Sequence, residues 1–166
     1  MAEITRKGVP IHTNGELPAV GSIAPDFRLT KNDLSDVGLA DFADKSKILS
    51  IVPSLDTGVC ADSTRQFDQL VANRDDVVVL VISADLPFAQ GRFCGAAGID
   101  RVQTLSMMRS RNFAKDYGVL VQDGPTAGIT ARAVVVLDAE NRVLHTELVS
   151  DTGHEPDYDA AFAALR

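Results

Sequence analysis

The chain has 166 residues, of which 45% are hydrophobic and 23% are charged, a composition typical of a globular protein with a substantial core. Its formal net charge of -7 would repel phosphate backbones and anionic lipids, which argues against nucleic acids and membranes as partners. The longest apolar runs, 77-VVVLVI-82 and 133-AVVVL-137, are far too short to span a membrane.

The first predicted element is a β-hairpin within residues 3–15. Lys7 and Gly8 suit its turn, and Pro10 favours an edge position, since proline cannot donate a hydrogen bond to a neighbouring strand. A short strand is predicted next, at 26-DFRLT-30. The N-terminal part of the chain is therefore expected to be β-structure joined by loops.

Two dense apolar runs, 47-KILSIV-52 and 77-VVVLVIS-83, predict strands that are buried on both faces. Between them, Phe67, Leu70 and Val71 recur at helical spacing, with charged and amide side chains on the opposite face. An amphipathic helix that joins two buried strands indicates a right-handed βαβ unit with parallel strands.

The second half of the chain predicts a further series of alternating elements. They are a helix over 87–98, a strand over 101–106, a helix over 110–118 ended by Gly118, a hairpin of strands 132–138 and 142–149, and a helix over 157–166. This order predicts an α/β fold similar to the thioredoxin fold, with a mixed central sheet flanked by helices and an N-terminal β-hairpin. No repeat or linker-like stretch interrupts it, so residues 1–166 are expected to form a single domain.

Cys60, one of only two cysteines, falls in the first turn of the helix predicted after the 47–52 strand. A free cysteine is commonly a small buried hydrophobe. At a helix start, however, unpaired backbone N–H groups and the positive end of the helix dipole favour a thiolate, which makes Cys60 a candidate nucleophile. Asp56 or Thr57 would cap this helix, and Thr57 would share a face with Cys60. Two interpretations of Thr57 are thus open. Its hydroxyl could donate a hydrogen bond to the sulfur or to the molecule that the sulfur attacks, or Thr57 could simply cap the helix.

Several kinds of thiol chemistry fit this pattern poorly. A phosphatase loop needs five residues between its cysteine and arginine, but only four separate Cys60 from Arg65, and a dithiol motif needs a cysteine where Ser63 stands. A cysteine hydrolase needs a histidine base, whereas the three histidines, at positions 12, 145 and 154, fall in the predicted hairpin, a strand and a late loop. Two cysteines and three scattered histidines also lack the spacing of metal ligands.

Peroxide reduction remains, in which a thiolate attacks one peroxide oxygen and becomes a sulfenic acid that condenses with a second thiol. Lowering the pKa of a thiol from ~8.5 to ~6 raises its thiolate fraction at pH 7 about 30-fold. The accompanying loss of nucleophilicity, for a Brønsted slope of ~0.45, is about 13-fold, so the net gain is only about twofold. A fast peroxidase therefore also needs positioned donors that stabilise charge on the departing oxygen.

Pro53, Thr57 and Cys60 form a P-x-x-x-T-x-x-C pattern that resembles the motif of the peroxiredoxins. A set of longer stretches is similar to the atypical two-cysteine thiol peroxidase subfamily: 53-PSLDTGVC-60, 83-SADLPFAQGRFCG-95, 131-ARAVVVLD-138 and 155-EPDYDAA-161. The resemblance covers nearly the full length of the chain, and no motif position departs from it.

The resemblance implies a role for each matching residue. Cys60 matches the peroxidatic cysteine, Thr57 the threonine that bonds to thiolate and peroxide, and Pro53 the proline that shields the sulfur from water. Arg132 matches the arginine whose guanidinium holds the thiolate and orients the peroxide. Without the resemblance, Arg132 would be read as a solvated charge at a strand end, although a permanently charged donor fork suits both tasks.

Cys94, the second cysteine, lies in the glycine-rich segment 91-GRFCGAAG-98. From the residues alone a buried helix cysteine explains it equally well, whereas the resemblance implies a resolving cysteine that forms a disulfide with Cys60 of the same chain. A disulfide needs Cα atoms about 4.4–6.8 Å apart, closer than two cysteines in separate helices of one layer are expected to lie. We therefore predict that one or both helices unwind locally during turnover, which the glycines around Cys94 make easier.

The resemblance as a whole implies a thiol-dependent peroxidase that reduces alkyl hydroperoxides and hydrogen peroxide in antioxidant defence and cell redox homeostasis. It further implies thioredoxin as the reductant, a homodimer, and no metal or organic cofactor. Because the N-terminal residues contain no signal-peptide pattern, a cytoplasmic location is expected.

Two alternatives to this function stay open at the level of the sequence. One is a peroxide-sensing relay that oxidises a partner protein, and the other is a redox-inert binding module with the thioredoxin fold. The preferred peroxide is also open, although Leu86 and Phe88, close to Cys94 in the sequence, would favour alkyl hydroperoxides if they lined the site.

Overall fold

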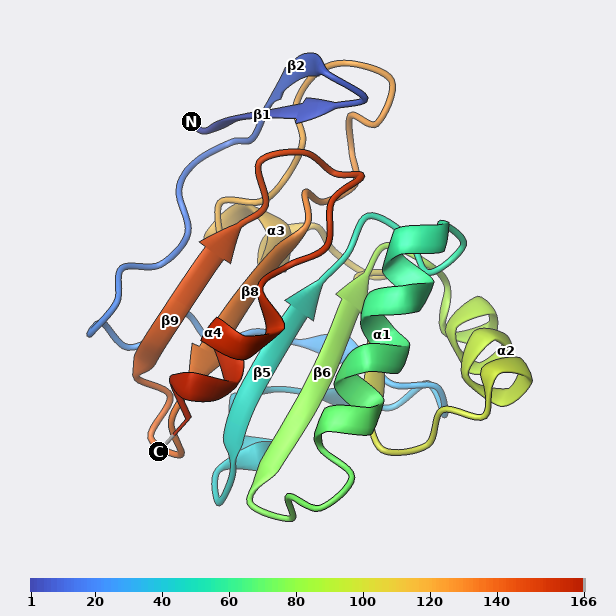
Figure 1. Ribbon diagram of the computed structural model, residues 1–166, viewed down its shortest axis with the longest axis vertical. Coiled ribbons are helices and arrows are strands. Elements are labelled where there is room, and N and C mark those ends of the chain that lie inside the picture. Colours follow the sequence, from blue (N-terminus) through green and yellow to red (C-terminus); the bar gives the residue numbers. More distant parts are fainter. Residues whose placement is uncertain (166) are drawn as a thin grey trace.

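The computed structural model describes residues 1–165, and its centre is a seven-stranded sheet (Figure 1). The strands follow the order β4-β3-β7-β6-β5-β8-β9 from one edge to the other. Their bounds are β3 Leu29–Thr30, β4 Asp36–Val37, β5 Ser46–Ile51, β6 Val77–Ser83, β7 Gln103–Ser106, β8 Ala133–Leu137 and β9 Val143–Leu148. The pairs β5·β6 and β6·β7 are parallel and the other neighbours are antiparallel, which confirms the predicted mixed sheet.

Different helices cover the two faces of this sheet. They are α1 (Gly58–Leu70), α2 (Pro87–Ala97), α3 (Asn112–Asp116), α4 (Tyr158–Ala163) and the 3-10 helix η1 (Leu39–Phe42). α1, α2 and α4 share a hydrophobic cluster with one face, whereas α3 and η1 pack on the other (Figure 1). In β5, Ile48 belongs to the first cluster and Leu49 to the second, so the strand is buried on both faces, as its apolar run predicts.

The N-terminal hairpin is present as predicted, formed by β1 (Glu3–Arg6) and β2 (Val9–His12). Lys7 and Gly8 make its turn with positive φ angles of 51° and 79°. Ile4 is buried in a small cluster with residues of the loop between α3 and β8. The hairpin therefore lies over the end of the molecule toward which β5 and β6 point (Figure 1).

The predicted strand over 26–30 is reduced to its last two residues, β3. The carboxylate of Asp26 accepts hydrogen bonds from the backbone N–H groups of Phe27 (2.8 Å) and Leu39 (3.0 Å). Phe27 is thereby withdrawn from strand pairing, because its donor already has a partner. The sequence did not predict β4 or η1, which are too short to show a hydrophobic period.

A buried aspartate also delays the strand predicted over 101–106. Asp68 of α1 accepts from the backbone N–H groups of Arg101 (2.8 Å) and Val102 (3.3 Å), so β7 begins only at the next residue. Asp68 belongs to the buried stripe of α1, whereas Leu70, which was predicted to be on it, is 37% exposed. The predicted helix is confirmed, but its inner face contains more polar residues than the apolar period indicated.

The remaining predicted elements agree closely with the structure. α2, β5, β8 and β9 begin and end within one residue of the predicted bounds, and β6 matches at both ends. The helix predicted over 110–118 is the shorter α3, and at Gly118 a Cβ atom would lie 2.1 Å from the carbonyl oxygen of Glu16, so only glycine fits. Asp157 caps α4, which ends earlier than predicted; the predicted last residue, Arg166, lies outside the described residues.

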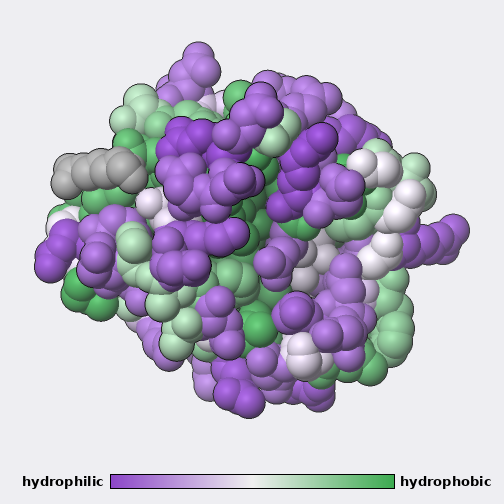
Figure 2. Space-filling model, turned by 90° about the horizontal axis from the view of Figure 1, so that it is seen from below, coloured by the Kyte–Doolittle hydropathy of each residue, from purple (hydrophilic) through white to green (hydrophobic). Residues whose placement is uncertain are grey.

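The surface at the end of the molecule away from the hairpin is dominated by hydrophilic side chains (Figure 2). Apolar residues appear there in the central hollow and along the margins of this face (Figure 2). Within residues 1–165, no helix is both long and apolar enough to cross a membrane.

Candidate active site

The loop between β5 and α1 brings three of the predicted site residues into one short segment. Pro53 lies near its beginning, Thr57 is the N-cap of α1, and Cys60 is the third residue of the helix. The Thr57 side chain makes no capping bond, and within residues 1–165 no other side chain bonds the backbone N–H groups of the first turn. Cys60 is completely buried, which places its sulfur behind the surface at the positive end of α1.

The Thr57 hydroxyl donates its hydrogen bond to the carbonyl oxygen of Ser54, at 3.0 Å. The same carbonyl accepts from the backbone N–H of Thr57, so the end of the loop is held in a tight turn. A hydroxyl has a single proton, and here it is engaged away from the sulfur of Cys60. Thr57 is therefore arranged to accept a hydrogen bond from a ligand, and not to donate one to the thiol.

Arg132 immediately precedes β8, which pairs with β5 so that Ala133 lies opposite Ile51. This register brings Arg132 next to the loop after β5, and the Thr130 hydroxyl fastens the two segments by donating to the carbonyl of Val52 at 2.9 Å. Arg132 is only 2% exposed. The interpretation of Arg132 as a solvated charge, which the sequence alone suggests, is therefore wrong.

The guanidinium of Arg132 is only partly satisfied. Its Nη2 donates to the carbonyl oxygen of Thr152 at 2.8 Å, while Nε and Nη1 are buried with no hydrogen-bond partner in the described residues. Burial raises the pKa of the nearby Tyr158 hydroxyl, and the positive charge of Arg132 opposes this rise. A buried cation with two free donors is costly unless something accepts from them, so this is the strongest indication of a ligand position in the site.

Pro53, Thr57 and Arg132 line one cavity of about 220 Å³. Its other walls combine apolar side chains, hydroxyls and two cations of the hairpin turn: Arg6, Lys7, Ser54, Gly58, Val59, Thr126, Ile129, Thr130, Thr152 and Gly153. Cys60, the residue after Val59, is buried and does not itself line this cavity. The structure thus brings three of the five predicted site residues, Pro53, Thr57 and Arg132, to one cavity.

Leu86 and Phe88 do not line this cavity. Both are exposed, at 52% and 66%, and Phe88 lines a separate depression together with Leu55 and Asp56. The apolar part of the Arg132 cavity comes from Pro53, a predicted site residue, and from Val59 and Ile129, which the sequence analysis did not assign to the site.

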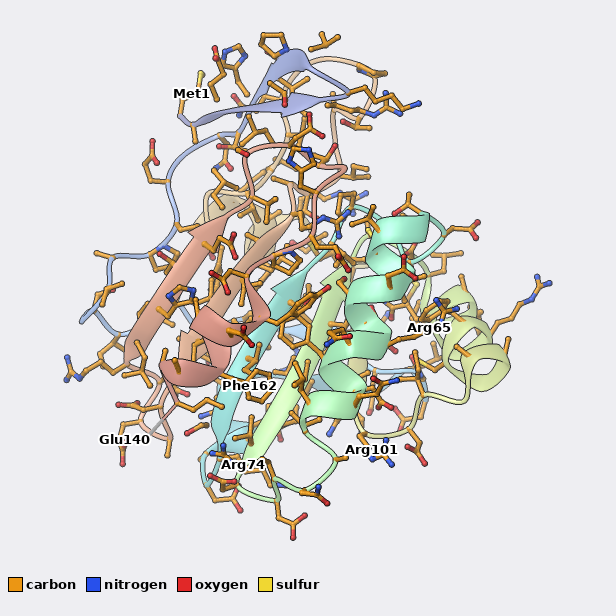
Figure 3. The ribbon with its side chains drawn as sticks, viewed as in Figure 1. Met1, Arg65, Arg74, Arg101, Glu140 and Phe162 are labelled. Atoms are coloured by element: carbon orange, nitrogen blue, oxygen red, sulfur yellow. The ribbon has the colours of Figure 1, made fainter. Side chains whose placement is uncertain are left out.

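Cys94, the fifth predicted residue, lies near the end of α2, is half-buried and lines a different cavity of about 320 Å³. Burial raises the pKa of its thiol, a hydrogen bond with Thr104 lowers it, and the charge of Asp68 raises it further. Cys60 and Cys94 are both free thiols that pack in the same hydrophobic cluster. Between their helices, the guanidinium of Arg65 lies over the ring of Phe93, 5.7 Å from its centre (Figure 3).

A residue that the sequence analysis did not single out, Asp85, holds the loop before α1 from the other side. Its carboxylate accepts from the Ser54 hydroxyl (2.7 Å), the Leu55 backbone N–H (2.8 Å) and the Ser83 hydroxyl (2.7 Å). The only signal in the sequence is its place in the stretch 83-SADLPFAQGRFCG-95. A carboxylate between two segments that meet only in the folded state leaves no local pattern.

The histidines lie apart from this cavity. His12, on the hairpin, pairs with Asp123 at 2.7 Å, and this contact raises the pKa of the imidazole. His145 lies in β9, as predicted. None of the three histidines is among the residues that line the Arg132 cavity. In residues 1–165, no group of three or more His, Cys, Asp or Glu side chains is placed to hold a metal ion.

Known proteins resemble this chain over its whole length. The sequence pattern of the Redoxin family matches residues 19–162. Thiol peroxidase from Staphylococcus aureus (strain MRSA252) is 50% identical over 166 residues, which is 100% of this chain and 99% of the relative. A crystal structure of a peroxiredoxin-like protein from Aquifex aeolicus superposes with a TM-score of 0.92 at 37% identity, covering 99% of this chain and 96% of that one.

A second solved structure, thiol peroxidase from Chromobacterium violaceum, superposes with a TM-score of 0.91 at 26% identity, covering 97% of this chain and 93% of that one. This likeness confirms the predicted thioredoxin-like fold. It also rules against the redox-inert binding module that the sequence left open. The chain therefore belongs to the Redoxin family, in which it is a peroxiredoxin enzyme of the thiol peroxidase type with thiol-dependent peroxidase activity.

Proposed function

We propose that this peroxidase reduces alkyl hydroperoxides and hydrogen peroxide through a sulfenic acid on Cys60, which Cys94 resolves as an intramolecular disulfide. The observation that carries the proposal is the buried guanidinium of Arg132. Its Nε and Nη1 have no partner in the described residues, and it lines the cavity at the start of α1, the helix that carries Cys60. Unpaired N–H donors on a permanent cation suit the oxygens of a peroxide and the negative charge that develops on the departing oxygen.

In the first step, the Cys60 thiolate attacks the nearer oxygen of ROOH, the O–O bond breaks and RO⁻ leaves to take up a proton. Arg132 stabilises both the thiolate and the departing oxygen, while Thr57 accepts a hydrogen bond from the peroxide, since its own proton is engaged with Ser54. Pro53, which lines the cavity, keeps water from the sulfur. The apolar walls near Val59 support a place for the alkyl group of a substrate.

In the second step, the thiol of Cys94 attacks the sulfenic sulfur of Cys60, a disulfide forms and water leaves. Both thiols lie in intact helices that share one hydrophobic cluster, and Cys94 lines a cavity other than the one lined by Arg132. We infer that part of α2 and the first turn of α1 unwind to let the sulfurs meet. Gly95, after Cys94, has no atom within 4 Å of its Cβ position and Gly98 ends α2 in a left-handed conformation, so unwinding disturbs few contacts there.

The finer biological setting is also proposed. Thioredoxin would reduce the Cys60–Cys94 disulfide by thiol–disulfide exchange and reset the enzyme. The 166 residues would act as one domain and pair as a homodimer in the cytoplasm, with antioxidant defence and redox homeostasis as the role. No metal or organic cofactor is needed, because the thiols carry the electrons.

A rapid-quench experiment tests the core of this proposal. The chain contains no tryptophan, so mass spectrometry follows the reaction better than intrinsic fluorescence. Reduced protein is mixed with one equivalent of hydrogen peroxide, cumene hydroperoxide or a lipid hydroperoxide and quenched at increasing times. The expected product has lost two hydrogens and yields a Cys60–Cys94 peptide pair, whereas unmodified thiols after excess peroxide would contradict the proposal.

Two cysteine variants separate the steps. Cys60→Ser should react with no peroxide. Cys94→Ser should consume one equivalent, gain one oxygen and then stall with thioredoxin as the reductant, because no internal disulfide can form. Full turnover of Cys94→Ser with thioredoxin would exclude the resolving role of Cys94.

A further inference from the structure

The carboxylate of Asp85 joins the two loops that lead into the thiol-bearing helices. On one side it accepts from Ser54 and Leu55, in the loop that leads to Cys60. On the other it belongs to the short connection between β6 and α2, where its own carbonyl oxygen accepts from the Ser106 hydroxyl of β7. A single side chain thus bridges the segments that precede Cys60 and Cys94.

The second loop is itself fixed to the start of α2. The Ser83 hydroxyl donates to Asp85 at 2.7 Å and accepts from the side-chain amide of Gln90 at 3.1 Å. Gln90 is fully buried and also donates to the carbonyl oxygen of Leu105 at 2.9 Å. This chain of bonds links Asp85 rigidly to the first turns of α2, since Ser83 lies in β6 and both Gln90 and Asp85 have a further partner in β7.

The first loop depends on Asp85 for its shape. Ser54 places the carbonyl group that receives the Thr57 hydroxyl, and Ser54 Oγ also accepts from the backbone N–H of Asp56 at 3.1 Å. Without Asp85, the Leu55 N–H and the Ser54 hydroxyl both lose their acceptor. The acceptor position of Thr57 in the peroxide cavity then has no fixed support.

We propose that Asp85 is a positioning residue that favours peroxide attack and restrains disulfide formation. The inference rests on the proposed function, because it assumes that Cys60 reacts with peroxide and is resolved by Cys94. The bonds of Asp85 hold Thr57 and the start of α1 in the arrangement that attack needs. The same bonds must yield when α1 and α2 unwind to bring the two sulfurs together.

The two roles predict opposite effects on the two steps. In Asp85→Ala, attack on peroxide slows about tenfold or more, because the donors and acceptors around the reacting oxygen are no longer held in place. Disulfide formation speeds up roughly fivefold, because at least one hydrogen bond no longer opposes unwinding. A general loss of stability would not slow one step and accelerate the other.

The test measures each step in isolation. Rapid-quench mass spectrometry gives the second-order rate of oxidation in a Cys94→Ser background, and the first-order rate of disulfide formation with both cysteines present. Asp85→Asn, which can keep an acceptor oxygen toward Leu55, should recover most of both rates. Ser54→Ala removes only one of the three bonds, so it should show the same two directions at smaller size even where Asp85→Ala folds poorly.

Asp56→Asn is the matched control. Asp56 lies in the same loop with the same charge, its side chain is exposed, and its carboxylate accepts no hydrogen bond in residues 1–165. Both rates should stay within twofold of the parent protein. The inference is overturned if Ser54→Ala and Asp85→Ala leave both steps unchanged, change only one, or slow both. Failure of the parent protein to react with peroxide would instead overturn the proposed function.

Discussion

Arg132 carries its positive charge into the interior with two nitrogen atoms unpaired in the described residues. Because a buried donor without an acceptor is costly, these nitrogens favour a ligand that can accept hydrogen bonds, as the proposed function requires. The sequence alone favoured a solvated strand-end charge here, and only the family resemblance indicated a catalytic one. The burial depends on long-range packing around Thr152 and the loop after β5, which no local pattern encodes.

Replacing Arg132 with lysine tests the value of its planar fork. Arg132→Lys keeps the charge but loses the paired donors, so kcat/KM with hydrogen peroxide should fall about 10- to 100-fold. Steady-state peroxide consumption measures this. Arg74→Lys, which alters an arginine that pairs with Asp76 at the opposite end of the molecule (Figure 3), is the control and should leave kcat/KM unchanged. Equal rates in Arg132→Lys and the parent protein would exclude the two-donor role.

The raised pKa of Cys94 predicts how disulfide formation depends on pH. Burial keeps this thiol protonated at neutral pH, so the attacking thiolate is a small fraction that grows as pH rises. The first-order rate of disulfide formation should therefore increase between pH 7 and 9 with an apparent pKa above that of an ordinary thiol. Thr104→Val removes the bond that lowers this pKa, so the rate at pH 7.5 should fall. A rate independent of pH would show that thiolate formation does not limit this step.

At the scale of elements, apolar runs and turn residues were enough to predict β6 at both ends and α2, β5, β8 and β9 within one residue. The strands that begin late do so where a carboxylate takes a backbone donor. Asp26 holds the N–H of its own neighbour, Phe27, whereas Asp68 of α1 holds the N–H groups of Arg101 and Val102, far along the chain. Secondary-structure propensity and hydrophobic periodicity depend only on residues close in the sequence. They therefore cannot predict that a carboxylate from another element will take the first N–H groups of a strand and delay its start.

The attachment of the N-terminal hairpin to the rest of the molecule should weaken at low pH. Asp151 accepts from the Thr5 hydroxyl and from the N–H groups of Gly153 (2.8 Å) and Gly8 (3.1 Å), which lowers its pKa to about 2. A lowered carboxyl pKa contributes stability that is present above the unfolded value near ~3.8 and is lost as pH falls toward 2. The protection of the Gly8 amide, measured as its exchange rate relative to that of an unstructured chain at the same pH, should therefore fall over this range.

Asp151→Asn supplies the control for the hairpin, because its amide does not titrate. In this variant the acid-dependent part of the exchange should disappear while residues of β6 exchange as in the parent protein. An unchanged acid response in Asp151→Asn would assign the effect to another carboxyl group.

For the whole molecule, the proposed cycle requires two regions to loosen while the sheet stays intact. β5 and β6 are buried along their entire length, whereas α2 has only two buried residues, Pro87 and Gln90, both in its first half. Oxidation should therefore raise amide exchange about 10-fold or more in the half of α2 that contains Cys94 and in the first turn of α1. Exchange in β5, β6 and β8 should not change.

Hydrogen exchange with mass spectrometry, on reduced and peroxide-treated protein, makes this comparison. The Cys94→Ser variant treated with one equivalent of peroxide is the control, since it is oxidised but cannot form the bridge. Protection of α2 that is equal in the bridged and reduced forms would contradict the proposed unwinding.

The register of the β5·β8 pair sets the position of the site residues. Because Ile51 is paired with Ala133, this register fixes both the position of Arg132, just before β8, and the start of the loop that leads from β5 into α1. Adding or removing one residue on either side of this pair would reverse which way the guanidinium points, even with every reactive group still present. Evolution can therefore exchange side chains along these two strands far more freely than it can alter their lengths.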